Sequence, residues 1–254
     1  MNWLKQTSEP LFPDILWSRP ENKRFAGKLL IIGGNSHGFS DAGLAYGAAE
    51  KAGVGTARVI LPDALEKVLR KTFPEAEFAA STPSGSFART ALGSLLDSSE
   101  WADAVLLAGD FGKNSETAVL LESFIGKYKG LLIMAGDSVD YFSANPASIT
   151  QRDKTLSAAS LPVIQKLATD TAIKQSSALA QVVEQLADWT ARNSASVLTE
   201  HSGQILASSR GKISTTQSDK PMGPELAAYA SVWLLQQPEK PFEALTTAVF
   251  CFYQ

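Results

Sequence analysis

The chain has 254 residues, of which 44% are hydrophobic and 19% charged, and its formal net charge is −3. This composition is typical of a globular protein with a sizeable core, and it excludes a disordered chain. The basic residues are scattered, so the sequence lacks the electrostatic footprint of a protein that binds nucleic acid or an anionic membrane. We therefore expect a small-molecule ligand, no nucleic-acid partner and no membrane partner.

The cysteine and histidine content restricts covalent and metal chemistry. Cys251 is the only cysteine, which excludes an internal disulfide and cysteine-based metal sites and fits a reducing cytoplasm. Two histidines, His37 and His201, argue against a multi-histidine metal site. We predict no metal site built from side chains alone, while Mg²⁺ held by carboxylates and phosphates stays open. The start of the chain lacks a signal-peptide pattern, and no apolar run reaches the roughly 20 residues that a spanning helix needs.

The first 26 residues are punctuated by Pro10, Pro13 and Pro20 and are predicted to run over the surface as an N-terminal arm. Beyond the arm, short apolar runs that end in glycine or a polar loop alternate with helical spacing. Strands are predicted at residues 28–34, 55–61, 75–80, 102–112 and 130–142, and three more within 195–217. Helices are predicted at residues 41–52, 63–73, 86–99, 115–129, 161–170, 177–193, 224–237 and 241–253. Asp41 is expected to be the N-cap or a first-turn acid of its helix, and Ser115 the cap of another.

This alternation predicts the fold class. Strands and helices that alternate over the first 135 residues imply right-handed crossovers and a mainly parallel central sheet with helices on both faces. The three short strands, joined by Ser-Gly and Arg-Gly turns, predict a β-hairpin region towards the C-terminus. No linker or shift in composition divides the chain, so residues 1–254 are predicted to form one α/β domain.

Three polar loops follow predicted strands: "GGNSHGFSD", "AGDFGKNSE" and "AGDSVDYF". Since ligands of open α/β sheets bind beyond the C-terminal ends of the strands, these loops are expected to form a polar crevice. The first loop lacks both the Gly-Lys-Ser/Thr of a phosphate loop and a complete G-x-G-x-x-G, and its glycines could equally just turn the chain. His37 could donate to a phosphate or hydroxyl. Asp110 and Asp137 could bind sugar hydroxyls, a metal or an amide, or cap a helix.

The segment "IIGGNSHGFSDAGLAYGAAEKAGVGTARVILP" resembles the first block of the ADP/ATP-dependent NAD(P)H-hydrate dehydratases, which belong to the ribokinase-like superfamily. "LLAGDFG" is similar to that family's Gly-Pro-Gly-Leu-Gly loop, and "AGDSV" to its Asp-Ala-Asp-Ala-Leu strand end. Near the C-terminus, "GPELAAYASVWLLQQPEKPFEAL" resembles the helix that follows the family's Gly-Thr-Gly-Asp anion hole. The likeness runs from Phe25 onward and is most specific in the first block.

The resemblance implies a three-layer ribokinase-like domain in which ADP or ATP, with Mg²⁺, drives dehydration of hydrated NADH or NADPH. It also implies a homo-oligomer. The substrate-binding positions that it implies are Gly34, Asn35, His37, Asp41, Asp110, Gly112 and Asp137. The nucleotide-binding positions that it implies are His201, Thr216 and Gly223. Glu225 falls where the family has its catalytic Asp. For His201 the sequence position alone predicts a different role, that of a residue flanking a hairpin turn.

The departures from the family concentrate at the nucleotide end. The family's His-Pro-x-Glu segment has no counterpart in "SAASLPVIQKLA", and its Lys-Gly appears as "TEHSG". The Gly-Thr-Gly anion hole reads "MGP", in which Pro224 has no N–H to donate. Glu225 is one methylene longer than Asp, and a misplacement of about 1 Å can cost on the order of 100-fold in rate. The sequence therefore predicts a divergent relative whose activity is weak or lost. Two alternatives stay open: a ribokinase-like small-molecule kinase, and a non-catalytic ligand-binding protein that kept the fold.

Overall fold

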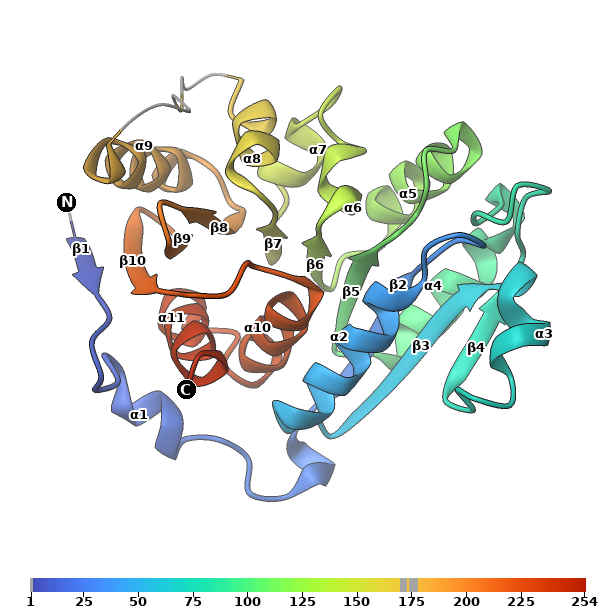
Figure 1. Ribbon diagram of the computed structural model, residues 1–254, viewed down its shortest axis with the longest axis horizontal. Helices are drawn as coiled ribbons and strands as arrows, with labels where there is room; N and C mark the ends of the chain where they lie inside the picture. The colour runs from blue at the N-terminus through green and yellow to red at the C-terminus, as the bar shows by residue number, and fades with distance from the viewer. Residues whose placement is uncertain (1, 170–172, 174–177) are drawn as a thin grey trace.

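The computed structural model describes residues 2–169, 173 and 178–254, and it contains one ten-stranded sheet (Figure 1). The strand order is β1-β10-β9-β8-β7-β6-β5-β2-β3-β4. All neighbouring pairs are parallel except β8–β9 and β9–β10, which are antiparallel. The strands are β1 (Asn2–Lys5), β2 (Lys28–Gly33), β3 (Thr56–Pro62), β4 (Ala76–Ala79), β5 (Ala104–Gly109), β6 (Leu131–Ala135), β7 (Thr155–Ala158), β8 (Ser196–His201), β9 (Gln204–Ser209) and β10 (Lys212–Gln217).

Helices cover both faces of this sheet and make a three-layer α/β architecture. The α-helices are α1 (Pro13–Trp17), α2 (Ser40–Lys51), α3 (Glu66–Leu69), α4 (Leu92–Trp101), α5 (Ser115–Lys127), α6 (Asp137–Asp140), α7 (Ala147–Thr150), α8 (Leu161–Leu167), α9 (Leu179–Arg192), α10 (Pro224–Gln236) and α11 (Pro241–Phe252). Short 3₁₀ turns lie at Lys23–Phe25, Asp63–Leu65 and Arg89–Ala91. One core cluster joins the sheet to α2, α10 and α11, and the other joins it to α4, α5, α8 and α9.

The central strands read as continuous apolar runs because both of their faces are covered. In β2, every residue after Lys28 is buried. The alanines on one side of α2, from Ala42 to Ala49, are buried against this core, where α2 packs on α10. Because these side chains are small, α2 and α10 can approach each other closely. The helix predicted at residues 41–52 therefore packs over the centre of the sheet.

The N-terminal arm is bound along its length. Strand β1 pairs in parallel with β10 at the sheet edge, beside which it lies in Figure 1. Phe12 packs edge-on against Phe242, with ring centroids 5.8 Å apart. The Arg19 guanidinium lies 4.4 Å from the ring centroid of Trp233 and donates to the carbonyl of Ala52.

The mainly parallel three-layer fold predicted from the sequence is confirmed, with local corrections. Strands β1 and β7 were not predicted, since β1 is a four-residue edge strand and β7 carries buried Thr and Ser where an apolar run was sought. Residues 63–73 form a 3₁₀ turn and the four-residue α3 rather than one helix. Asn114, not Ser115, caps α5, because its side chain accepts from two backbone N–H groups of the first turn. Residues 170 and 177, at the ends of two predicted helices, lie outside the described residues.

Over the described ranges, no helix combines the length and apolar character needed to cross a membrane.

Candidate functional site

The site follows from the strand order. Starting from β2, the chain adds β3 and β4 on one side and then returns to place β5 on the other. Between β2 and β5 the direction of winding therefore reverses, and such a switch point leaves an open crevice at the C-terminal ends of the strands. The loops after β2, β5 and β6 all reach this edge of the sheet.

Asn35 joins the loop after β2 to the loop after β5. It is buried, its Oδ1 accepts from the backbone N–H of His37 at 2.8 Å, and its Nδ2 donates to the carbonyl of Asp110 at 2.6 Å. Its backbone N–H donates to the carbonyl of Gly38 at 2.7 Å. One amide side chain thus fixes both loops, because it uses its donor and its acceptor on two different segments.

The same two loops approach each other too closely for side chains. A Cβ on Gly33 would lie only 2.8 Å from the carbonyl oxygen of Gly109. Gly109 itself has φ +108°, and the following Asp110 has φ +59°, a left-handed conformation rare outside glycine. Observed strain of this kind concentrates at functional sites, and here it turns the Asp110 carboxylate towards Gly38 and the start of α2.

Four carboxylates meet in the opening, and we call Asp41, Asp110, Asp137 and Glu225 the carboxylate crevice. The point where a Cβ of Gly109 would sit lies 3.1 Å from Asp41 Oδ2 and 3.2 Å from Asp137 Oδ1. The Asp41 backbone N–H donates to Asp110 Oδ2 at 3.3 Å. Asp41 and Asp137 therefore both approach the backbone at Gly109.

Burial and mutual repulsion change the ionisation of this crevice. The pKa of Asp41 is raised from 3.8 to about 6, first by burial and then by the charges of Asp110, Asp137 and Glu225. The pKa of Asp137 is also raised, by burial and by Asp110, although two backbone N–H groups hydrogen-bond to it and act in the opposite direction. Like charges in one site favour retention of a proton. The crevice is thus able to accept hydrogen bonds from hydroxyl or amine donors and holds a group that can protonate near neutral pH.

Two cavities open on the carboxylate crevice and share Asp137 and Asp140 in their walls. The inner cavity has a volume of about 460 Å³ and is lined by Asp41, Ala108, Ala135, Gly136, Asp137, Asp140, Ala158, Ala159, Ser160, Val163, Met222, Gly223 and Pro224. The outer cavity has a volume of about 530 Å³ and is lined by Asn35, Asp110, Gly112, Lys113, Asn114, Ser115, Asp137, Asp140 and Tyr141. Asp140 forms an ion pair with Lys166 at 2.6 Å, and this hydrogen bond holds its pKa below the ordinary value.

The N-terminus of α10, where the resemblance places a phosphate, lacks two of the donors that this site would use. Pro224 is the first helical residue and has no N–H. The N–H of Met222 already donates to Glu200 Oε2 at 2.8 Å. Glu225 folds back over the helix end, so that its Oε2 lies 3.0 Å from the point where a Cβ of Gly223 would sit. Two donors are thus lost, and two carboxylates occupy the space in which an anion would need positive charge.

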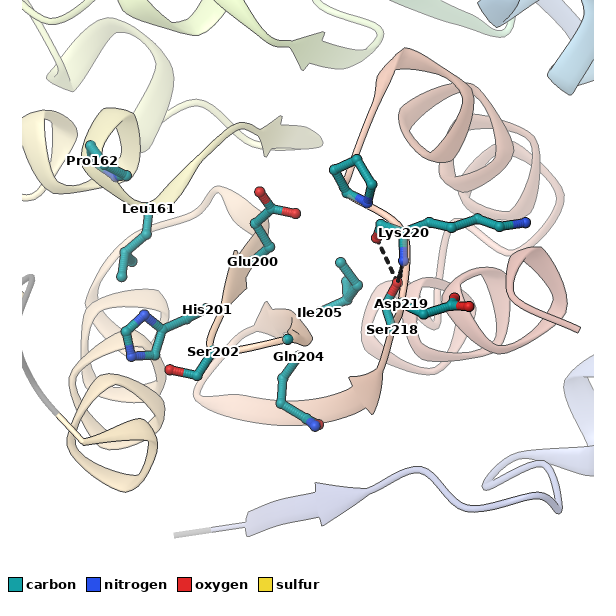
Figure 2. Close-up of a pocket in the computed structure, with 12 residues that line it drawn as sticks. Leu161, Pro162, Glu200, His201, Ser202, Gln204, Ile205, Ser218, Asp219 and Lys220 are labelled. Carbon is teal, nitrogen blue, oxygen red and sulfur yellow. Dashed lines mark hydrogen bonds between the residues drawn. The ribbon is translucent and has the colours of Figure 1, made fainter.

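A third cavity of about 420 Å³ lies next to this helix end, between the β8–β9 hairpin and the loop that leads into α10. Figure 2 shows Glu200, His201 and Ser202 on one side of it and Ser218, Asp219 and Lys220 on the other. Leu161, Pro162 and Ile205 add apolar wall.

No protein-family model and no curated protein matches this chain, whereas solved structures do. A ribokinase-like superfamily protein from Enterococcus faecalis V583 superimposes with a TM-score of 0.73 at 20% identity, covering 98% of this chain and 86% of that one. The ADP/ATP-dependent NAD(P)H-hydrate dehydratase of Bacillus subtilis, co-crystallised with ATP/Mg²⁺ and soaked with CoA, gives a TM-score of 0.70 at 13% identity over 100% of this chain and 88% of that one. The phosphomethylpyrimidine kinase of Clostridium difficile 630 gives 0.57 at 11% identity over 89% of this chain and 100% of that one. The fold is ribokinase-like.

Within this ribokinase-like fold, most of the residues singled out from the sequence meet at one edge of the sheet. Asn35, Asp41, Asp110, Gly112, Asp137 and Gly223 line the two cavities of the crevice, and Glu225 stands at its side. Two substrate-side positions lie outside the cavities. Gly34 serves the close approach of the loops, with φ +90° and its N–H bonded to the carbonyl of Gly109, and His37 is exposed on the loop.

The nucleotide-side positions do not form one group. His201 lines the third cavity, Gly223 lines the inner cavity, and Thr216 is buried in β10 opposite Ile205 without lining either one. Asp140 was not predicted from the sequence. It lies one helical turn after Asp137, and this spacing could have indicated that the two carboxylates share one side of a helix. Glu200 was not predicted either, because its bond to Met222 spans 22 positions and left no local signal.

The residues present do not fit the implied nucleotide and Mg²⁺. Among the residues that the structure describes, no group of three or more Asp, Glu, His or Cys side chains is arranged to hold a metal ion. The end of α10 offers carboxylates where phosphate oxygens would lie. Side chains alone therefore form no Mg²⁺ site over the described residues, and we derive no step through ADP or ATP.

Proposed function

We propose that this chain is a divergent relative of NAD(P)H-hydrate dehydratases that binds a hydroxyl-bearing small molecule in the carboxylate crevice, with nucleotide-driven dehydration weak or lost. The observation that carries the proposal is the state of the α10 N-terminus. There Pro224 lacks a donor, Glu200 occupies the N–H of Met222, and Glu225 covers Gly223.

The loss of catalysis follows from what phosphoryl transfer requires. That chemistry depends almost entirely on positioning and on donors that stabilise the charge of the transferring group. Removal of a single such donor typically costs about 10²–10³ in rate. Here the lost donors come together with carboxylates that repel a phosphate, so the combined cost is expected to exceed that of one donor.

The crevice supports ligand binding by its size and its chemistry. Cavities of about 460 and 530 Å³ lie within the range of ordinary small-molecule sites. Ala108, Ala135 and Ala158 give the inner cavity an apolar wall against which a ring can pack, while Asp41 and Asp137 can accept from hydroxyls. A hydrated nicotinamide nucleoside combines these features, and it is the ligand class that we propose.

A second candidate is a small-molecule kinase of the same fold. It draws support from Glu225, whose charge is close enough to the crevice to raise the pKa of Asp41. A carboxylate in this position could take a proton from a ligand hydroxyl. This candidate needs a phosphate donor at the end of α10, whereas the main proposal does not.

A thermal-shift panel with NADH, NADPH, hydrated NADPH, ADP and ATP, each with and without Mg²⁺, tests the binding part. A ligand at about 100 times its dissociation constant stabilises the fold by about 2.7 kcal/mol. We expect hydrated NADPH to raise the melting temperature, Asp137→Asn to remove most of that shift, and Asp97→Asn on the surface of α4 to leave it intact. A shift with ADP or ATP alone would favour the kinase, and no shift with the hydrated dinucleotide would refute the proposed ligand class.

A further inference from the structure

A small cavity lies at the opposite edge of the sheet from the carboxylate crevice. It is formed where β6, β7 and β8 begin and where β9 turns into β10, and the link between α10 and α11 closes it. Its volume is about 70 Å³, and its lining residues are Leu131, Lys154, Thr155, Ser194, Ser196, Ser209, Arg210, Leu234, Pro238 and Pro241. We call it the Ser209 cavity.

The charged groups of the Ser209 cavity have one sign. Lys154 and Arg210 are exposed at its opening, and within the described part of the chain neither side chain makes an ion pair or a hydrogen bond. None of its described lining residues is acidic. The nearby Glu243 is already engaged, since Lys212 pairs with it at 3.0 Å. The opening is thus locally positive in a chain whose net charge is −3.

A buried hydroxyl supplies a donor inside the cavity. Ser209 is 1% exposed, and its Oγ accepts a hydrogen bond from Ser196 Oγ at 2.8 Å. A serine hydroxyl has one proton to donate, and over the described residues that of Ser209 has no acceptor. A buried donor without an acceptor is costly, and an acceptor bound in the cavity would remove that cost.

The size and the remaining walls restrict what this acceptor can be. A space of about 70 Å³ corresponds to on the order of five water-sized positions, so a ligand of about five heavy atoms would fill it. One side of the cavity is apolar and is formed by Leu131, Leu234, Pro238 and Pro241. A purely inorganic anion has no apolar part that could pack against this side. The fitting class has a charged acceptor at one end and a short hydrocarbon tail at the other.

We propose that the Ser209 cavity binds a small aliphatic monocarboxylate. One carboxylate oxygen accepts from the Ser209 hydroxyl, the charge faces Lys154 and Arg210, and the tail packs against Leu131 and Leu234. Hydrogen bonds to an ionised acceptor are about twice as strong as neutral ones, which gives the carboxylate its advantage over an uncharged ligand of the same shape. The site lies at the far edge of the sheet, so it does not depend on the function proposed for the crevice.

Titrations of the purified chain with propionate, propionamide and chloride, followed by NMR chemical shifts and melting temperature, test this site. Propionamide keeps the shape without the charge, and chloride keeps the charge without the tail. We expect propionate to bind with a dissociation constant at least about tenfold lower than either control, as one charge-assisted hydrogen bond allows. Arg210→Gln and Ser209→Ala should each weaken propionate about tenfold, while Lys67→Gln on α3 should leave binding unchanged.

Equal affinity for propionate and propionamide would overturn the proposal, and so would an Arg210→Gln variant that binds propionate as the wild type does. Arg210 is exposed, so this variant should fold even if Ser209→Ala does not. The comparison between Arg210→Gln and Lys67→Gln then decides the question by itself.

Discussion

The substitution Asp41→Asn should stabilise the protein at neutral pH and lose this effect in acid. Asp41 lies in the first turn of α2, where Asp110, Asp137 and Glu225 surround it with negative charge. Asparagine has nearly the same shape and carries no charge at any pH. The backbone N–H that bonds to Asp110 is unchanged by the substitution.

The sign and the magnitude follow from the pKa of Asp41, which burial and neighbouring carboxylates raise from 3.8 to about 6 in the folded chain. Between these two values the native state binds more protons than the unfolded state, so the free energy of unfolding falls as the pH rises. The stabilisation that protonated Asp41 gives to the folded chain is complete below pH 3.8 and is lost above about pH 6. An unscreened shift of this size corresponds to about 3 kcal/mol. Since Asp41 is only half-buried, solvent screening should reduce the effect to about 1–2 kcal/mol.

Urea unfolding and thermal melts of wild type and Asp41→Asn, at pH 4 and at pH 7.5, measure this difference. For a chain of this length, the variant should gain about 3–6 °C in melting temperature at pH 7.5 relative to its gain at pH 4. Asp97→Asn on α4 controls for the removal of one negative charge. Equal effects of Asp41→Asn at the two pH values, or a loss of stability at pH 7.5, would refute the electrostatic account of the crevice.

Four further substitutions test the packing and the loops. Gly55→Ala should destabilise the fold by about 1–3 kcal/mol in urea unfolding, because the new Cβ would lie 2.4 Å from the carbonyl oxygen of Lys23; wild-type stability would show that the arm does not pack as described. Gly126→Ala should stabilise α5 by about 0.5–1 kcal/mol, because that helical position has open space, and a loss would contradict this. Asn35→Ala should cost about 1–3 kcal/mol in unfolding free energy and weaken the crevice ligand in calorimetry, whereas His37→Ala, on the exposed side of the loop, should do neither. An Asn35→Ala variant that binds the ligand as the wild type does would place the ligand elsewhere.

The elements that could be predicted from the sequence are those whose signal is local. Strands β2, β5 and β6 appear as continuous apolar runs because neighbours cover both of their faces. Strand β7 carries Ser157 and Thr155 in its buried core, so its place in the sheet depends on the pairing with β6 and β8, which no short window reveals. Strand β1 depends in the same way on its distant partner β10.

The parts of the candidate site that could be predicted are likewise those with a local signal in the sequence. The loops of the crevice could be predicted because each one follows a strand, and parallel strands bring their C-terminal ends to one edge. The sequence did show that Pro224 lacks a donor. It could not show that Glu200 occupies the N–H of Met222 or that Glu225 folds over Gly223, since both depend on how the hairpin and α10 pack. The proposed loss of the phosphate site therefore rests on tertiary contacts in addition to one substitution that is visible in the sequence.

Turnover of hydrated NADPH by the purified chain, with ADP or ATP and Mg²⁺, tests the central claim most directly. The appearance of NADPH is followed by absorbance, with Glu225→Gln measured beside the wild type. The lost donors and added carboxylates at the end of α10 predict a rate far below about 1 per second that Glu225→Gln does not lower further. A rate of about 1 per second or faster that depends on Glu225 would contradict the claim that this chain has lost its nucleotide-driven chemistry.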